Sequence, residues 1–277
     1  MNEHPAPSTH APTMFLCEPT YFEIEYAINP WMDLANQVDK ALAQEQWQNL
    51  YTCLRRLGVH IETIPPQPHL PDMVFTGDAG IVIGGVFIAS NFRPVERRAE
   101  SLHFQQWFKA QNYRVETLPS SVFFEGLGDV VIYGHQAIAA YGIRTSADAV
   151  PYMQNALPQL QFRCVLELVD PKYFHIGIAL AWLDSETIMY VPEAFSPASR
   201  AVITQLVPNV IALDAVDAAN FAINAIVVDR HLVLHRCSEQ LRNRLQALDF
   251  QVIECNVSEF VKSGGGTRCL VLPKVEI

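Results

Sequence analysis

The stretch Ser263-Gly264-Gly265-Gly266-Thr267-Arg268-Cys269 lies close to the C-terminus and leads into the apolar run Leu270-Val271-Leu272. Successive glycines allow a tight turn with positive φ angles, and the apolar run is typical of a buried strand. A thiol at the start of a strand, beside a flexible turn and Arg268, is a candidate nucleophile. On these residues alone, Cys269 could equally be a small buried hydrophobic side chain, with Gly264 ending a short helix.

The pattern of a polar residue followed by a strand, a short turn and a second strand recurs along the chain, as in β-hairpins. Its lead residues are Asp78, Glu125, His175, Asn224 and Cys269, separated by 47, 50, 49 and 45 positions. A helical stretch and a further strand follow each of the first four hairpins. A nearly constant period of this kind indicates a repeat architecture, here with the unit strand-strand-helix-strand.

The N-terminal part of the chain supplies the rest of the fifth unit. A helix is expected at residues 32–57, with Gly58 at its C-terminal end, followed by a strand at residues 59–64. The other expected helices span residues 95–110, 147–157, 197–206 and 238–248, and the last is the clearest, with Leu241, Leu245 and Leu248 on one face. Because both termini complete one unit, a closed α/β ring is favoured over a solenoid, and a ring brings the five lead residues to one axis.

Composition limits the class of protein. Half of the residues are hydrophobic and 17% are charged, which suits one large α/β domain over residues 14–277 behind a disordered tail at 1–13. The net charge of -10 argues against nucleic acid as a partner. We expect no secretory signal and no transmembrane helix, and the scattered cysteines, without a C-x-x-C pair, indicate a reducing, cytoplasmic location. A homodimer remains open.

Each lead residue has an ordinary structural interpretation when taken singly. Asp78 could form a turn, Glu125 could be a solvated loop carboxylate, His175 could be a core histidine, and Asn224 could cap a turn. The glycines of 125–129 could suggest a phosphate-binding loop, but no Lys-Ser/Thr pair follows them.

Together, the lead residues fit nucleophilic catalysis on a planar, cationic substrate. Carboxylates such as Asp78 and Glu125 bind guanidinium N–H groups through charge-assisted hydrogen bonds. A histidine transfers protons, and a thiolate attacks the central carbon. The spacing offers no obvious metal motif.

At these residues the sequence resembles the pentein superfamily of guanidino-group-modifying enzymes. This superfamily includes dimethylarginine dimethylaminohydrolases, arginine deiminases and dihydrolases, and amidinotransferases. The resemblance extends over nearly the whole chain and is carried by the segments Glu25–Met32, Pro71–Asp78, Phe124–Asp129, Leu168–His175 and Gly264–Cys269.

The resemblance implies a five-fold α/β propeller and a role for each matching residue. Cys269 is then the nucleophile, His175 the general acid and base, and Asp78 and Glu125 the guanidinium ligands, with Glu125 also counted among the catalytic residues. Arg97 and Arg144 match the arginines that hold the substrate carboxylate. Further substrate contacts are expected from residues in or near the same motifs, namely Phe75, Asp129 and Asn224. No cofactor or metal is implied.

Two departures from the family patterns bear on the substrate. Arginine deiminases and dihydrolases typically carry an acid two places after the catalytic histidine, where this chain has Gly177. Dihydrolase-like relatives usually have asparagine in place of Asp78. Both differences favour an N-methylated arginine, converted to citrulline and an amine, over free arginine. The alternatives are an arginine deiminase or dihydrolase, an amidinotransferase, and an inactive pentein that only binds a ligand or partner.

Overall fold

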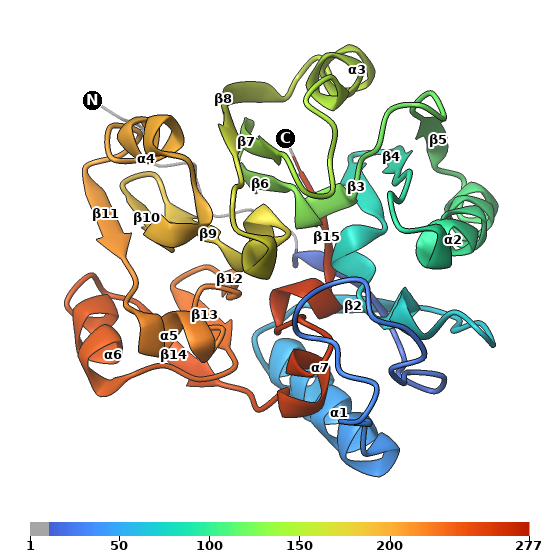
Figure 1. Cartoon of the computed structure of the whole chain (residues 1–277), viewed down its shortest axis with the longest axis horizontal. Coiled ribbons are helices and arrows are strands. Elements are labelled where there is room, and N and C mark those ends of the chain that lie inside the picture. The colour runs from blue at the N-terminus through green and yellow to red at the C-terminus, as the bar shows by residue number, and fades with distance from the viewer. Residues whose placement is uncertain (1–10, 277) are drawn as a thin grey trace.

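The computed structural model describes residues 11–276. Five blades surround a central axis, so the expected ring of five units is confirmed (Figure 1). In each blade the first strand pairs antiparallel with the second, and the second pairs parallel with the third. A helix connects the second strand to the third, as parallel pairing requires a long crossover.

Four blades follow one another along the chain, and each consists of three strands and a crossover helix. They are β3 (Gly80–Ile83), β4 (Val86–Ala89), α2 (Arg98–Ala110) and β5 (Arg114–Thr117); β6 (Val130–Tyr133), β7 (Gln136–Tyr141), α3 (Ala149–Ala156) and β8 (Gln161–Glu167); β9 (Leu180–Asp184), β10 (Thr187–Tyr190), α4 (Pro197–Ile203) and β11 (Asn209–Ala212); and β12 (Ile226–Val228), β13 (His231–Leu234), α6 (Glu239–Gln246) and β14 (Gln251–Glu254). The short helices α5 (Ala215–Ala219) and α7 (Ser258–Val261) lie in connections.

The two ends of the chain close the ring. The fifth blade joins β15 (Leu272–Val275) from the C-terminus to β1 (Thr13–Cys17), α1 (Lys40–Arg56) and β2 (His60–Ile64) from the N-terminus. β1 pairs antiparallel with β15 and parallel with β2, and β15 also pairs with β3 of the neighbouring blade. The predicted closure of the fifth unit is therefore confirmed.

Three expected boundaries are wrong. Thr13 already pairs with His60 in β1, so the expected tail at 1–13 extends too far, and its residues 1–10 lie outside the described residues. The first helix starts at Lys40 rather than at residue 32, because Asp39 Oδ1 accepts hydrogen bonds from two N–H groups of the first turn. The last strand starts at Leu272, because residues 268–270 form a 3₁₀ turn.

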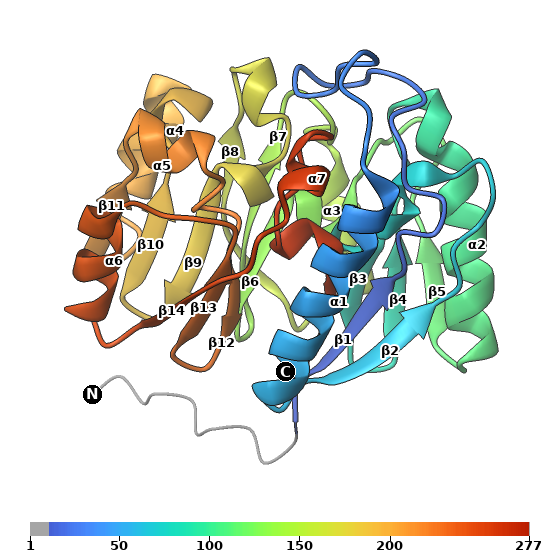
Figure 2. The same ribbon diagram turned by 90° about the horizontal axis from the view of Figure 1, so that it is seen from below.

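The strands form the inner layer of the ring and the crossover helices form the outer layer (Figures 1 and 2). Aromatic side chains fill the space between them; Phe87 on β4 stacks on Phe108 of α2 with ring centroids 4.0 Å apart. In Figure 2 the hairpin turns lie along one edge of the ring, and the loops that precede the first strands lie along the other. No helix within residues 11–276 is both long and apolar enough to cross a membrane.

Candidate active site

The lead residues of the repeat converge at the start of the first strand of each blade. Asp78 and Cys269 lie within short 3₁₀ turns, and Glu125 and His175 directly precede such turns. Asn224 lies in the turn before β12. All five side chains are buried, and Cys269 is the most exposed at 9%. The ring therefore brings residues separated by nearly two hundred positions to its axis, as the period predicts.

Glycines make this convergence sterically feasible. A Cβ added to Gly128 would lie 2.7 Å from Asp78 Oδ1 and 2.9 Å from His175 Nδ1, and one added to Gly266 would lie 2.6 Å from Asn224 Oδ1. These separations are shorter than van der Waals contact. The backbone must approach these side chains closely, which only glycine allows.

Asn224 positions the thiol of Cys269. Its Nδ2 lies 3.3 Å from Cys269 Sγ and 2.6 Å from the carbonyl oxygen of Gly177, so it donates to both. Its Oδ1 accepts hydrogen bonds from the backbone N–H groups of Arg268 and Cys269, at 2.9 and 3.3 Å. The side chain thus fixes both the turn and the sulfur atom.

Three carboxylates surround the ring of His175. Nε2 lies 2.9 Å from Glu125 Oε2 and 4.0 Å from Asp129 Oδ2, and Nδ1 lies 3.5 Å from Asp78 Oδ1. Burial by itself lowers the pKa of His175, but the negative charges of Asp78, Asp129 and Glu125 outweigh it and raise the pKa above 6.5. The surrounding carboxylates therefore stabilise the protonated imidazole, which is the form that a general acid requires.

Glu125 is held as an anion by its two cationic neighbours. Arg144 Nη1 donates to Glu125 Oε2 at 2.8 Å, on the oxygen that also contacts His175. Although burial raises the pKa of Glu125, Arg144 and His175 lower it to about 2. In contrast, burial raises the pKa of the neighbouring Asp129 to about 6, and Asp129 Oδ1 accepts from the Ile176 N–H.

Arg97 is placed against acids rather than toward open space. Its guanidinium donates to Asp78 Oδ2 at 2.7 Å and to both carboxylate oxygens of Glu100 at 2.9 Å. Asp72 lies at the edge of this cluster and accepts a hydrogen bond from Tyr26. The sequence reasoning missed Glu100, which the i,i+3 spacing from Arg97 could have indicated, and Asp72, for which the sequence gives no such signal.

The two arginines that were expected to bind the substrate carboxylate have other partners in this structure. They form ion pairs with the two acids that were expected to bind the substrate guanidinium. Arg97 neutralises Asp78 and Arg144 neutralises Glu125. Phe75 lies beneath the glycine turn, where a Cβ on Gly265 would be 2.3 Å from its ring. Phe75 therefore supports the turn and also lines the pocket described next.

The converged residues enclose a small pocket. Asp78, Arg97, Arg144, His175 and Cys269 all contribute to its wall, and its volume is about 20 Å³. A space of this size holds about one water molecule. Its other walls come from the loop before α1, through Ile28, Asn29 and Met32, and from Gly264 and Gly265.

The covering loop is anchored directly to the glycine turn and to the edge of the site. Asn29 Nδ2 donates to the carbonyl of Ser263 at 3.1 Å, and Trp31 Nε1 donates to the carbonyl of Lys172 at 2.8 Å. Arg144 Nη2 donates to the carbonyl of Ile28 at 3.0 Å. The loop that begins at Glu18 therefore closes over the pocket, a property that the sequence left open.

The closed pocket keeps Cys269 as a thiol. Burial, with a further contribution from the charge of Asp78, raises the pKa of Cys269 to about 12, although Asn224 and Arg268 act in the opposite direction. A cation bound beside the sulfur would lower this pKa. Within residues 11–276, no group of three histidine, cysteine or acidic side chains is arranged to hold a metal ion.

Comparison with known proteins supports the resemblance found in the motifs. The family model for eukaryotic N,N-dimethylarginine dimethylhydrolase matches residues 11–276. The N(G),N(G)-dimethylarginine dimethylaminohydrolase of Mycobacterium tuberculosis is 36% identical over 92% of this chain and 83% of its own length. The bifunctional arginine dihydrolase/ornithine cyclodeaminase AgrE of Nostoc is 34% identical over 94% of this chain, which spans 37% of that longer protein.

Solved structures agree with both the fold and the family. The N-terminal domain of ArgZ, an arginine dihydrolase from cyanobacteria, bound to its product superposes with a TM-score of 0.92 and 32% identity, covering 96% of this chain and 98% of that domain. The expected propeller is thereby confirmed, and the match covers every blade. The chain belongs to the N,N-dimethylarginine dimethylhydrolase family and is an amidinohydrolase of the pentein superfamily.

Proposed function

We propose that the protein hydrolyses N-methylated arginine, such as N,N-dimethylarginine, to citrulline and the corresponding methylamine. The observation that carries the proposal is the convergence of Cys269, His175 and Asp78 on one buried pocket, with Glu125 hydrogen-bonded to His175 directly behind it. These are a nucleophile, a proton donor and two carboxylates, which a planar guanidinium requires. The complete set argues against a pentein that only binds ligands.

Binding of the substrate exchanges one set of ion pairs for another. The guanidinium of the substrate takes the place of Arg97 at Asp78 and of Arg144 at Glu125, and the two arginines are then available for the substrate carboxylate. Because an unpaired buried charge is costly, each acid that loses its arginine must gain the substrate guanidinium, and the displaced arginines must gain the substrate carboxylate. Since the pocket now holds about 20 Å³, the loop that carries Ile28 and Asn29 must move for the substrate to enter.

The bound cation then activates the nucleophile. Its positive charge lowers the pKa of the Cys269 thiol from about 12, so the thiol loses its proton to solvent water as the substrate binds, and Asn224 donates a hydrogen bond that stabilises the thiolate. Sulfur attacks the guanidinium carbon, and His175 gives its proton to the departing methylated amine. The C–N bond breaks and a covalent thiouronium on Cys269 remains.

Water completes the reaction at the same carbon. His175, now neutral, removes a proton from water, which adds to the thiouronium carbon. The C–S bond then breaks and the sulfur takes the remaining proton of the added hydroxyl group, which releases citrulline and restores the thiol, while His175 keeps the proton that it took from water. The carboxylate of Glu125 stays ionised next to Nε2 of His175. It therefore stabilises the imidazolium both before amine release and after proton transfer from water.

Gly177 supports the preference for a substituted guanidine. A Cβ added there would lie 3.0 Å from Arg268 Nη1, so the arginine occupies the region that an acid at position 177 would need. The site therefore lacks a second acidic clamp at this position. A methylated guanidinium has fewer N–H donors than an unmethylated one. It therefore loses less when no second carboxylate is present to accept hydrogen bonds.

The rival assignment is an arginine dihydrolase, which the high structural similarity to ArgZ favours. Asp78 counts against it, since dihydrolase-like relatives usually carry asparagine there. An amidinotransferase would use the same thiouronium but pass it to an amine.

Product analysis separates these reactions. The purified protein is incubated with dimethylarginine, monomethylarginine and arginine, each with and without an added amine. Citrulline from the methylated substrates but not from arginine supports the proposal. Ornithine and ammonia from arginine would identify a dihydrolase, transfer to the amine a transferase, and no turnover of any substrate would contradict the proposal.

A further inference from the structure

A second and much larger hollow lies on the axis of the ring, on the side away from the catalytic pocket. Its volume is about 600 Å³, which is within the range of ligand-binding sites. First strands from four of the five blades line it, namely β6, β9, β12 and β15. We refer to it as the axial cavity.

The axial cavity opens at the hairpin turns. Asp129 and His175 precede β6 and β9, whereas the cavity wall includes Gly134 and Asp184 at the opposite ends of these strands. Gly134 is exposed, which places the mouth of the cavity at the hairpin-turn face. The two hollows thus lie at opposite ends of the same strands.

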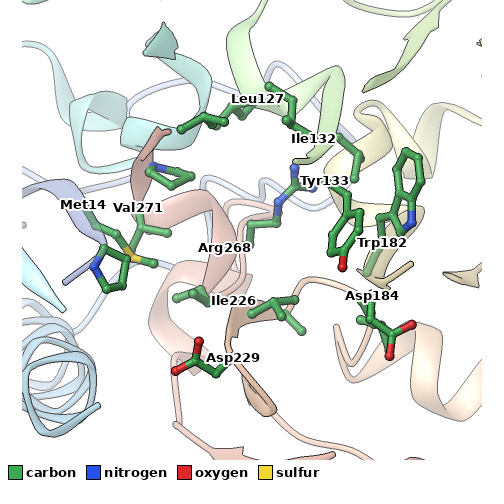
Figure 3. Close-up of a pocket in the computed structure, with 18 of the residues that line it drawn as sticks. Met14, Leu127, Ile132, Tyr133, Trp182, Asp184, Ile226, Asp229, Arg268 and Val271 are labelled. Carbon is green, nitrogen blue, oxygen red and sulfur yellow. The ribbon is translucent and has the colours of Figure 1, made fainter. Parts of the chain in front are cut away.

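Most of the cavity wall is apolar, and one guanidinium enters it. Figure 3 shows the side chain of Arg268 in the middle of the cavity, with Leu127 and Ile132 on one side and Ile226 on the other. Arg268 Nη2 donates to the carbonyl of Val130 at 3.1 Å. This is the one side-chain hydrogen bond of Arg268 within the described chain, although a guanidinium carries five N–H donors.

Arg268 forms no ion pair with any acidic side chain of the described residues. The other two cations of the wall have acidic partners: Arg230 pairs with Asp184 at 2.6 Å and Lys274 pairs with Glu276 at 2.8 Å. Among the described residues no carboxylate lies within 4.0 Å of Arg268. A cation surrounded by apolar groups is costly unless an anion accompanies it.

Two aromatic side chains and one acidic side chain of the wall indicate which kind of ligand would fit the cavity. Tyr133 and Trp182 stack on each other with centroids 5.7 Å apart and form one side of the cavity. Trp182 Nε1 is buried and has no hydrogen-bond partner within the described residues. Asp229 also lines the cavity, and it lies on an exposed hairpin turn.

We propose that the axial cavity binds a small carboxylate with an apolar or aromatic body, whose carboxylate pairs with Arg268 and whose body packs between Leu127, Ile226 and Trp182. The carboxylate receives charge-assisted hydrogen bonds from guanidinium N–H groups that the protein leaves free. This site is separate from the catalytic pocket and does not depend on the proposed reaction.

Calorimetric titration with phenylacetate tests the proposal, and phenylacetamide serves as the uncharged control of the same shape. The wild-type protein is compared with Arg268→Met, which removes the charge, and Val227→Trp, which fills the cavity from a partly exposed position on β12. Arg236→Met, on an exposed arginine outside the cavity, is the matched control. Thermal unfolding establishes that each variant is folded.

We expect saturable binding of phenylacetate and at least about tenfold weaker binding of phenylacetamide, as lost charge-assisted hydrogen bonds predict. Arg268→Met and Val227→Trp should each weaken phenylacetate binding by at least about tenfold, and Arg236→Met should leave it unchanged. If Arg268→Met fails to fold, Arg268→Lys replaces it and should retain binding. Equal binding of acid and amide, no saturable binding to wild type, or unchanged binding in Val227→Trp would overturn the proposal.

Discussion

The two hollows on the axis of the ring differ in almost every physical property. The catalytic pocket has a volume of about 20 Å³ and is lined by buried acids, arginines, His175 and Cys269. The axial cavity has a volume of about 600 Å³, and its wall is mostly apolar around Arg268. The first is closed by a loop, and the second opens at the face that carries the hairpin turns.

This difference shows that the chemistry of the wall, rather than its volume, identifies the reactive end of the ring. Among the described residues, the wall of the large cavity contains no cysteine or histidine. The small pocket, in contrast, concentrates ionised groups that perturb one another's pKa values. One turn supplies both hollows through adjacent residues, because Cys269 lines the pocket and Arg268 lines the cavity.

Removal of the sulfur should have the largest effect. Cys269→Ser is expected to lower kcat by at least about 10⁴-fold, because the serine hydroxyl cannot replace the thiolate as nucleophile. Citrulline formation from dimethylarginine measures the effect. Cys53→Ser, on the outer helix α1, is the matched control and should retain turnover within about twofold; an active Cys269→Ser enzyme would refute the assignment.

Removal of one negative charge from the pocket should have the next largest effect. Glu125→Gln is expected to lower kcat by about 10²- to 10³-fold, as His175 loses the anion that stabilises its protonated form. Because Glu125 is one of the three carboxylates that raise the pKa of His175, removal of its charge should lower this pKa. An NMR titration of His175 measures this shift, and an unchanged or raised pKa would argue against the proposed role of Glu125.

The ionised state of Glu125 also predicts a dependence of stability on pH. Its pKa falls from 4.5 to about 2 on folding, so the folded state gains stability above pH 4.5 and loses it as the pH falls toward about 2. The contribution at neutral pH is about 3 kcal/mol by this shift. Urea unfolding of wild type and Glu125→Gln across this range should give a difference that declines in acid; a constant difference would contradict the ion-pair account.

A smaller effect should follow from crowding the pocket without changing its charge. Gly128→Ala places a Cβ against Asp78 and His175 and should lower kcat by about tenfold to 100-fold. Gly85→Ala, on the hairpin turn of the same ring, meets no atom within 4 Å and is the matched control. Steady-state kinetics compare the two variants, and equal activity would show that the close approach at Gly128 has no catalytic importance.

Much of the difference between the two ends of the ring could be predicted from the sequence. The repeat period brings the five lead residues to one axis, and the closure of the fifth blade follows from the two ends of the chain. Periodicity does not report which charged side chains meet. The pairing of Arg97 with Asp78 and Glu100, and of Arg144 with Glu125, depends on side-chain geometry inside the ring.

Two further features depend on contacts between distant segments. The loop over the pocket is held by hydrogen bonds from Asn29 and Trp31 to residues far away in the sequence. Arg268 stands beside Cys269 in the sequence and its charge lowers the pKa of the thiol, and its side chain also enters the axial cavity on the other side of the turn, which the sequence does not show. The late start of the first helix has a local cause, because Asp39 caps it, which the spacing of apolar residues alone does not show.

Mass spectrometry of the protein after rapid acid quenching, during turnover of dimethylarginine, would detect the covalent intermediate itself. We expect an adduct on the peptide that contains Cys269, with the mass of the substrate less dimethylamine, and no adduct on the peptide that contains Cys53. An active enzyme that carries no adduct on Cys269, at quenching times shorter than a turnover, would contradict catalysis through this cysteine.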